Sequence, residues 1–272
     1  MFGCYATVFA TYPKDGDFLK AKIIALANQK GGVGKTTTAV NLSACLAEKK
    51  KRVLLVDSDP QGNATSGFGI NKSELKHTIY DVLINSFPAA EGIIHTEYAV
   101  DVLPANIDLA GAEIELVSAI SRETRLKTAL LPLVGSYDYI LIDCPPSLGL
   151  VTLNSLAAAD SVLMPIQCEF YALEGVSQLM NTIKLVKQHL NPDLAVEGVL
   201  LTMYDGRTNL SEQVAEEVRA NFGDKVYKTM IPRSVRLSEA PSYGQPIIVY
   251  DKKSKSAQVH RELTKEVIAR GK

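Results

Sequence analysis

The fold of this chain is decided by the stretch Gln29-Lys30-Gly31-Gly32-Val33-Gly34-Lys35-Thr36-Thr37. It follows an apolar run, Ile23 to Ala27, and precedes an amphipathic segment, Ala39 to Lys50. A strand, a glycine loop and a helix in this order are the context of a phosphate-binding loop. Glycines let backbone N–H groups converge on an anion, and the helix N-terminus adds the positive end of its dipole. The stretch therefore predicts a site for a nucleoside triphosphate.

Two residues of the stretch have direct roles in such a loop. Lys35 would reach the β- and γ-phosphates, and the hydroxyl of Thr36 would ligate Mg²⁺. The sequence departs from the general G-x-x-x-x-G-K-[ST] pattern at one position, since Gln29 stands where the first glycine is usual. It has instead a second lysine, Lys30, directly before the glycine pair. A glycine-rich turn without this function is the alternative, and the strand and helix on either side disfavour it.

The size and composition are those of a globular protein. The 272 residues fit one large domain, with 46% hydrophobic and 22% charged residues. No apolar run approaches the ~18 residues of a membrane-spanning helix, and the first twenty residues lack the order of a signal peptide. The four cysteines are scattered, without a C-x-x-C pair, which is typical of reduced thiols in the cytosol. We therefore expect a cytoplasmic protein.

The charge is unevenly distributed along the chain. The formal net charge of −1 does not by itself indicate nucleic-acid binding. The segment from Lys225 to Lys272, however, holds 11 Lys and Arg against 4 Asp and Glu, a local charge of +7. This excess is either a nucleic-acid footprint or a solvated surface, and charge alone favours the solvated surface.

Apolar runs alternate with helical patterns along most of the chain. Strands are predicted at residues 23–27, 52–56, 100–103, 139–142, 161–166, 196–203 and 226–231. Further helices are predicted at residues 107–131, with a break near Ser121, and at 173–189, 210–222 and 256–269. Continuous apolar strands between amphipathic helices indicate a parallel sheet covered on both faces. We expect one α/β P-loop domain over residues 22–272, a mostly parallel twisted sheet with helices on both faces, whose ligand binds at the C-terminal ends of the strands.

Residues 1–21 do not fit this pattern. Their apolar stretch, residues 4–10, has no clear period, and residues 13–17 have the composition of a turn. We interpret residues 1–21 as a flexible N-terminal extension, such as an over-long gene start would produce. A functional tail is the alternative.

Acidic residues follow two of the predicted strands. Asp143 ends the strand at 139–142 in the manner of a Walker B aspartate, which holds Mg²⁺ directly or through water. Asp57 and Asp59 follow the strand at 52–56. A carboxylate at this position can orient the attacking water or bind the water shell of the metal. The sequence Asp-Pro-Gln-Gly is also an ordinary turn, but a phosphate-binding loop one strand away favours a switch-like role.

Six segments together resemble the deviant Walker A ATPases, and within them the ParA/Soj branch, which partitions chromosomes and plasmids. The segments are Lys30 to Thr37, Val56 to Thr65, Ile142 to Ser147, Glu169 to Gly175, Leu201 to Leu210 and Ile231 to Ser242. The resemblance runs from about Lys22 to the C-terminus. It implies a P-loop ATPase with ATP and Mg²⁺ as cofactors.

The resemblance also implies roles for individual residues. Lys30 is the signature lysine of the family, which crosses a two-fold interface to the nucleotide of the other subunit, and Gly31 lies at that interface. Asp59 corresponds to the aspartate needed for hydrolysis, and Asp57 to its partner near the metal. The implied metal site comprises Thr36, Asp57 and Asp143. The implied nucleotide site comprises Lys30, Gly31, Gly32, Val33, Gly34, Lys35, Thr36, Thr37, Pro232 and Ser234. Pro232 and Ser234 match the loop that holds the adenine, although many relatives have Asn at the position of Ser234.

The resemblance implies partners as well. Arg207 and Arg236 match the arginines with which relatives bind DNA without sequence preference; from the residues alone, a surface arginine in a salt bridge is an equal alternative. Two ATP-loaded subunits would close into a homodimer that binds DNA on the nucleoid. A ParB (Spo0J-like) partner would stimulate an otherwise slow hydrolysis, which releases the DNA. A protein that holds ATP without turnover is a further alternative, and the pairing of Asp59 with Asp143 disfavours it.

Two related classes of protein share this core. A MinD-like membrane switch needs a C-terminal amphipathic helix with bulky apolar anchors, and only Val267 and Ile268 qualify here. We therefore expect no membrane binding. An electron carrier needs cysteines that share an iron–sulfur cluster between subunits. Cys144 and Cys168 are the candidates, and neither has the glycine-flanked context expected for that role.

Overall fold

The computed structural model describes residues 20–169 and 174–271. Most of the predicted N-terminal extension, residues 1–19, lies outside the described residues, so its role stays a prediction. Ala21 already belongs to the core, because it is buried and its N–H donates to the carbonyl of Val134.

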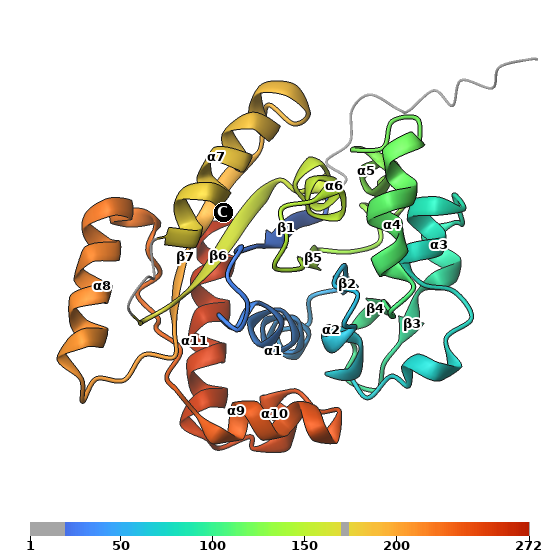
Figure 1. The fold of residues 1–272 in the computed structure, drawn as a ribbon. Coiled ribbons are helices and arrows are strands. Elements are labelled where there is room, and N and C mark those ends of the chain that lie inside the picture. Colours follow the sequence, from blue (N-terminus) through green and yellow to red (C-terminus); the bar gives the residue numbers. More distant parts are fainter. Residues whose placement is uncertain (1–19, 170–173, 272) are drawn as a thin grey trace, which may run out of the picture.

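A seven-stranded sheet forms the centre of the described structure (Figure 1). Its order is β3-β4-β2-β5-β1-β6-β7. All neighbouring strands pair in parallel except β3 with β4, which confirms the mostly parallel sheet. The strands are β1 (Lys22–Leu26), β2 (Val53–Asp57), β3 (Ile94–His95), β4 (Asp101–Leu103), β5 (Tyr139–Asp143), β6 (Ser161–Gln167) and β7 (Ala195–Thr202).

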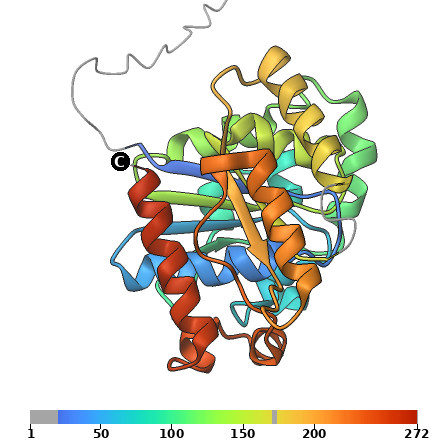
Figure 2. The ribbon, with the colours of Figure 1, turned by 90° about the vertical axis from the view of Figure 1, so that its left-hand side faces the viewer.

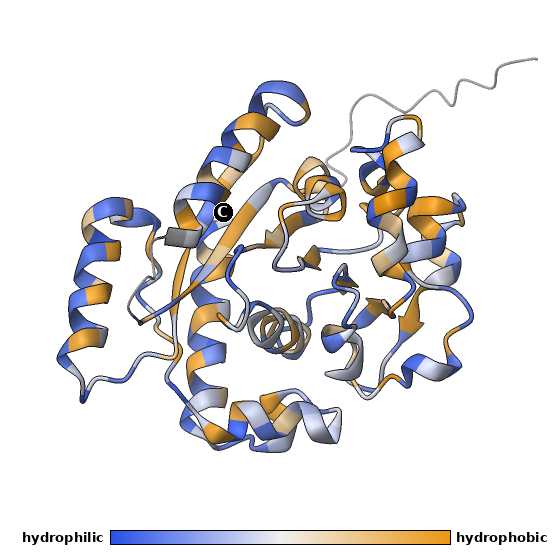
Figure 3. Cartoon of the chain, viewed as in Figure 1, coloured by the Kyte–Doolittle hydropathy of each residue, from blue (hydrophilic) through white to orange (hydrophobic). Residues whose placement is uncertain are grey.

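Helices cover both faces of this sheet, as expected. One hydrophobic cluster joins one face to α3, α4, α5, α6, α7 and α8, and a second joins the other face to α1, α9, α10 and α11. In Figure 3 the strands between these two layers are predominantly hydrophobic. The helices are α1 (Lys35–Glu48), α2 (Asn63–Ser66), α3 (Ile79–Ile84), α4 (Leu109–Glu115), α5 (Arg125–Leu130), α6 (Leu150–Ala158), α7 (Glu174–His189), α8 (Asn209–Phe222), α9 (Val235–Glu239), α10 (Ile247–Tyr250) and α11 (Lys255–Arg270).

The predicted strand at residues 226–231 is wrong. The segment runs beside β7 but makes only a single isolated bridge to it. Two of its backbone N–H groups, at Lys228 and Thr229, donate to the carboxylate of Glu266. The guanidinium of Arg270 donates to the three carbonyls of residues 224–226. Two side chains of α11 therefore take several of the backbone groups in and just before this segment, while the N–H groups of Tyr227 and Ile231 still donate to carbonyls of β7.

The predicted helix at residues 107–131 is interrupted, as the sequence indicated. It forms α4 and α5 with irregular turns between them, and Ser121 in this connection has a φ of 51°. A non-glycine residue in the left-handed region cannot continue a helix.

Helix α11 packs across α1 (Figure 2). It carries a buried histidine, His260. The Nδ1 atom of His260 lies 2.8 Å from the carbonyl oxygen of Ser256, and its Nε2 has no hydrogen-bond partner among the described residues. Burial lowers the pKa of His260 to about 4. Because the unfolded chain binds this proton more readily, stability is lost as the pH falls from about 6.5 towards 4.

We expect the variant His260→Asn to resist acid better than the wild type. Asparagine keeps a donor for the Ser256 carbonyl but does not titrate. Between pH 7 and pH 5 the wild type should lose about 2 kcal/mol more of its free energy of unfolding than the variant. Urea denaturation at several pH values measures this difference. Equal losses in the two proteins would show that His260 is not the acid-sensitive group.

Candidate functional site

The predicted phosphate-binding loop joins β1 to α1 in the expected way. Gly32 and Gly34 have φ angles of 73° and 88°, a region that glycine adopts without a steric penalty. Gly34 is the N-cap of α1, and neither a capping side chain nor an acidic residue occupies the first turn. The free N–H groups of that turn are therefore available to an anion.

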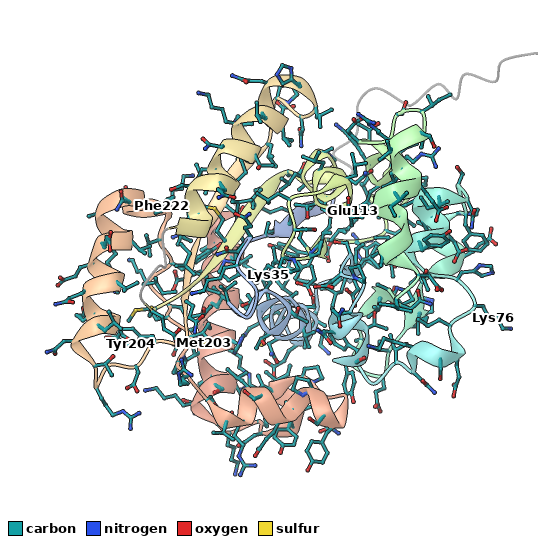
Figure 4. All side chains as sticks on the ribbon, in the orientation of Figure 1. Lys35, Lys76, Glu113, Met203, Tyr204 and Phe222 are labelled. Atoms are coloured by element: carbon teal, nitrogen blue, oxygen red, sulfur yellow. The ribbon has the colours of Figure 1, made fainter. Side chains whose placement is uncertain are left out.

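Lys35 is the first residue of α1 and lies near the centre of the molecule (Figure 4). It is only 7% exposed. Its ammonium donates to the carbonyl oxygens of Asn28 and Lys30, at 3.0 and 3.2 Å. Burial lowers the pKa of Lys35, and the nearby Asp143 opposes this shift. The loop thus holds a buried cation beside its own backbone, where the charge acts in a low-dielectric environment.

Two side chains that the sequence did not single out brace this loop. The Asn28 amide donates to the carbonyl of Pro165 at 2.7 Å and accepts from the N–H of Lys30 at 3.0 Å. The hydroxyl of Thr202 donates to the carbonyl of Val33 at 2.8 Å. Strands β6 and β7 thereby fix the loop from one side. Only the fold brings these residues together, because they lie more than 130 positions apart in the chain.

Asp57 and Asp143 end neighbouring parallel strands and are register partners in the sheet. Both are fully buried. Burial, and then the charge of Asp57, raise the pKa of Asp143 well above its usual value. Neither carboxylate oxygen of Asp143 has a hydrogen-bond partner among the described residues. A buried carboxylate of this kind is costly unless a cation or donor satisfies it.

The residues around Asp143 fit Mg²⁺. This ion prefers oxygen ligands and usually keeps several waters and phosphate oxygens. The Thr36 hydroxyl lies close enough to Asp143 to lower its pKa in part. Within the described ranges, no three acidic, histidine or cysteine side chains gather to hold a metal by themselves.

Unlike Asp143, Asp57 has hydrogen-bond partners for both of its carboxylate oxygens. One of its carboxylate oxygens accepts from both the N–H and the hydroxyl of Thr65, each at 2.7 Å. The other accepts from the N–H of Asp59 at 3.2 Å. Burial raises the pKa of Asp57 to about 6, and these three hydrogen bonds oppose the shift. Asp57 therefore anchors the loop that leads to α2, and its predicted place near the metal stays a prediction.

Asp59 stands within this anchored loop. It is 9% exposed, and one carboxylate oxygen accepts from the N–H of Gln61 at 2.9 Å. It lies near enough to Lys35 and Asp143 for its charge to affect the pKa of both. The structure thus gathers Lys35, Asp57, Asp59 and Asp143, as the sequence predicted, and their catalytic roles stay predictions.

A cavity of about 260 Å³ adjoins the loop on the side of β7. Gly34 and Thr37 line it together with Pro232 and Ser234, the two residues predicted to hold the adenine. Met203, labelled in Figure 4, also lines it and has a strained φ of 51°. The other lining residues, to which the sequence analysis gave no role, are Thr38, Thr202, Ile231, Arg233, Leu237, Ser238 and Pro241.

The two arginines predicted to bind DNA are both exposed and both in salt bridges. The Arg207 side chain is 89% exposed and pairs with Asp205 at 2.7 Å. Arg236 pairs with Glu239 at 3.2 Å and with Asp251 at 3.8 Å. Exposed pairs of this kind contribute ~0–1 kcal/mol, so they do not prevent either guanidinium from contacting a phosphate.

Some cations of the basic C-terminal segment are bound by other groups of the protein. Arg261 pairs with Glu48 at 2.7 Å, Arg233 pairs with Glu169, and Arg270 binds backbone carbonyls. The local charge of +7 therefore overstates the positive charge that this segment presents to solvent.

Comparison with known proteins decides the family. Residues 21–196 match a family described as an AAA domain. The chain is 64% identical to the sporulation initiation inhibitor protein Soj of Bacillus subtilis, covering 92% of this chain and 99% of Soj. It is 59% identical to the chromosome partitioning protein ParA of Myxococcus xanthus, covering 92% and 88% of the two chains. The chain belongs to the ParA/Soj family. It is therefore an ATPase.

Solved structures show the same fold as this ParA/Soj ATPase. A cobyrinic acid a,c-diamide synthase of Mycobacterium smegmatis, with bound ADP and magnesium, is 42% identical with a TM-score of 0.81, over 91% of this chain and 94% of that one. The cell division ATPase MinD of Pyrococcus furiosus is 28% identical with a TM-score of 0.76, over 92% and 99%. The Soj and ParA relatives are more similar in sequence than either structure.

Proposed function

We propose that this ATPase is a nucleotide-driven switch that partitions chromosomes or plasmids. With ATP and Mg²⁺ as cofactors it forms a homodimer, binds DNA without sequence preference on the nucleoid of the cytoplasm, and releases it on hydrolysis. A ParB-type (Spo0J-like) protein is the partner that stimulates this hydrolysis. The relatives named Soj and ParA support the proposal.

The edge of the phosphate-binding loop carries this proposal. Gly31 is exposed, its φ lies outside the left-handed region, and a Cβ added there would meet nothing within 4 Å. Nothing in the described structure therefore requires glycine at this position. Lys30 beside it makes no ion pair with any described residue. A bare backbone next to a free cation suits the approach of a second subunit, since two facing triphosphates need additional positive charge.

Each side chain of the site then has one task. Lys35 binds the β- and γ-phosphates, while Pro232 and Ser234 hold the adenine. Thr36 and Asp143 would hold Mg²⁺, which neutralises charge on the phosphates.

The switch itself depends on the two acidic loops. Asp59 orients the attacking water, and Asp57 keeps the loop around it in place through Thr65. The γ-phosphate orders the segments that follow Asp57 and Asp143, so its loss on hydrolysis releases them. The dimer then opens.

DNA binding follows from dimerisation. When two subunits close into a dimer, the dimer carries Arg207 and Arg236 of both subunits. Several weak contacts to phosphates, acting together, then give avidity. Contacts to phosphates carry no sequence information and weaken steeply with salt.

The packing of α11 favours this function over a MinD-like membrane switch. Val267 is fully buried, and Ile268 packs partly buried against the same core. A membrane anchor would have to present such residues to lipid. Over the described ranges, no helix has the length and hydrophobicity needed to span a bilayer.

The double variant Arg207→Ala, Arg236→Ala tests the DNA surface. We expect it to keep ATP binding and dimerisation while its DNA affinity falls at least ~10-fold, with a salt slope flattened by about 0.9 per lost phosphate contact. Fluorescence anisotropy with non-specific duplex DNA and ATP, across a salt series, measures both quantities. The matched control is Arg52→Ala, Arg122→Ala, which removes two other surface arginines paired with carboxylates. Unchanged DNA affinity in the test variant would place the DNA surface elsewhere.

A further inference from the structure

Helix α6 is capped by a side chain from another helix. Its N-cap residue is Gly149, which has no side chain to offer, and its first turn contains no acidic residue. Glu113, which Figure 4 places between α4 and α6, supplies the cap instead. One carboxylate oxygen accepts from the N–H of Leu150 at 2.8 Å and the other from the N–H of Val151 at 3.3 Å. A carboxylate here also stabilises the positive end of the helix dipole.

Gly149 is shaped to receive this carboxylate. A Cβ added to Gly149 would meet both Glu113 oxygens at 2.5 Å and the carboxyl carbon at 2.7 Å, and these are its three nearest neighbours. The φ of Gly149 is −82°, which any residue can adopt. A side chain at position 149 would therefore displace the Glu113 carboxylate from its present place, although the backbone conformation of Gly149 would accept one.

The capped end of α6 lies at the far end of the loop that begins at Asp143. The near end is fixed because Ser58 donates through its N–H and hydroxyl to the carbonyl of Asp143, at 3.0 and 2.7 Å. Within the loop, the hydroxyl of Thr152 donates to the carbonyl of Ser147 at 2.6 Å. Glu113 thus fixes one of the two ends between which residues 144–149 are held.

The helix that carries Glu113 is also tied to the other acidic loop. The hydroxyl of Thr65, which donates to Asp57, accepts from the N–H of Ala105 at 3.0 Å. Ala105 lies in the connection from β4 to α4. One short segment therefore links the Asp57 loop, through α4, to the loop after Asp143.

We propose that Glu113 is a positioning residue for ATP hydrolysis. By capping α6, Glu113 fixes the position of the loop that follows Asp143. Because α4 is tied both to this loop and to the loop that follows Asp57, the positions of the two loops depend on each other. This inference rests on the proposed function, because it assumes that the site hydrolyses ATP. Among the described residues, the hydrogen bonds of the Glu113 carboxylate go to α6 and not to the phosphate-binding loop, so nucleotide affinity should not depend on Glu113.

The variant Glu113→Gln tests this role. An amide offers one acceptor oxygen in place of two and turns an N–H₂ group towards the second helical N–H. We expect kcat for ATP to fall at least ~10-fold, since small displacements of catalytic groups have such effects, while the dissociation constant for ATP stays within about 3-fold. Glu115→Gln is the matched control, because Glu115 lies on the same helix and its carboxylate accepts only from the Tyr80 hydroxyl among the described residues. Circular dichroism at the assay temperature confirms that every variant is folded.

A double-mutant cycle separates positioning from simple destabilisation. Gly149→Ala alone pushes a methyl group into the Glu113 carboxylate and should lower kcat. In the Glu113→Ala background those atoms are gone, so adding Gly149→Ala should change kcat by less than about 2-fold. Additive losses of kcat, or a loss of ATP affinity equal to the loss of kcat, would overturn the inference.

The wild type distinguishes this inference from the proposed function. Hydrolysis by the wild type with Mg²⁺ and DNA, together with equal hydrolysis by Glu113→Gln, would refute only the role of Glu113. Absence of hydrolysis in the wild type would refute both.

Discussion

Lys35→Ala is expected to abolish ATP binding, with affinity falling at least ~100-fold, or about 3 kcal/mol. The ammonium is buried at the N-terminus of α1, beside the glycine loop, where a phosphate would meet a poorly screened charge. Titration with a fluorescent ATP analogue measures this loss. Lys30→Ala is the matched control, because its charge would act on the nucleotide of the other subunit. The monomer of that variant should bind ATP normally.

Retained micromolar affinity in Lys35→Ala would refute the assignment of the phosphate-binding loop. Equal losses in the two lysine variants would instead mean that both lysines contact the nucleotide of their own subunit, and the proposed interface at Gly31 would lose its support.

Asp59→Ala is expected to bind ATP but to hydrolyse it at least ~100-fold more slowly. It should therefore accumulate as an ATP-bound dimer on DNA. The measurement is DNA binding by this variant with ATP, with ADP and without nucleotide, across a salt series. Binding that requires ATP and weakens with salt is the expected result. Turnover equal to that of the wild type would remove Asp59 from the catalytic machinery.

The same experiment distinguishes the two kinds of switch. If Asp59→Ala with ATP bound liposomes and not DNA, the ATPase site would stand, but the partner would be a membrane. The buried position of Val267 argues against that outcome, because α11 would have to leave the core to reach lipid.

The features that were predictable from sequence are those with a local cause. The glycine loop has its strand and helix as immediate neighbours, and the buried strands are continuous apolar runs. Asp57 and Asp143 could be placed together because parallel strands end at one edge of the sheet. The break at Ser121 was visible as a local change of pattern.

The remaining features have distant causes. The segment at residues 226–231 is apolar enough for a strand, but Glu266 and Arg270 on α11 take several of its backbone groups. The braces from Asn28 and Thr202 act across more than 130 residues. The sequence contains one signal at α6 that our prediction did not use, the glycine at its N-cap. A helix that begins after a glycine has no capping side chain of its own and requires a cap from elsewhere. The sequence could not indicate that this cap is Glu113.

The buried pair of Asp57 and Asp143 has a consequence for engineering. Burial and the charge of Asp57 disfavour the ionised form of Asp143, and an uncharged amide at position 143 avoids this cost, so the isolated protein would tolerate heat better with asparagine there. Selection for heat resistance alone would therefore favour variants that have lost this carboxylate and, with it, the metal. Activity must be selected together with stability if the protein is to be made more robust.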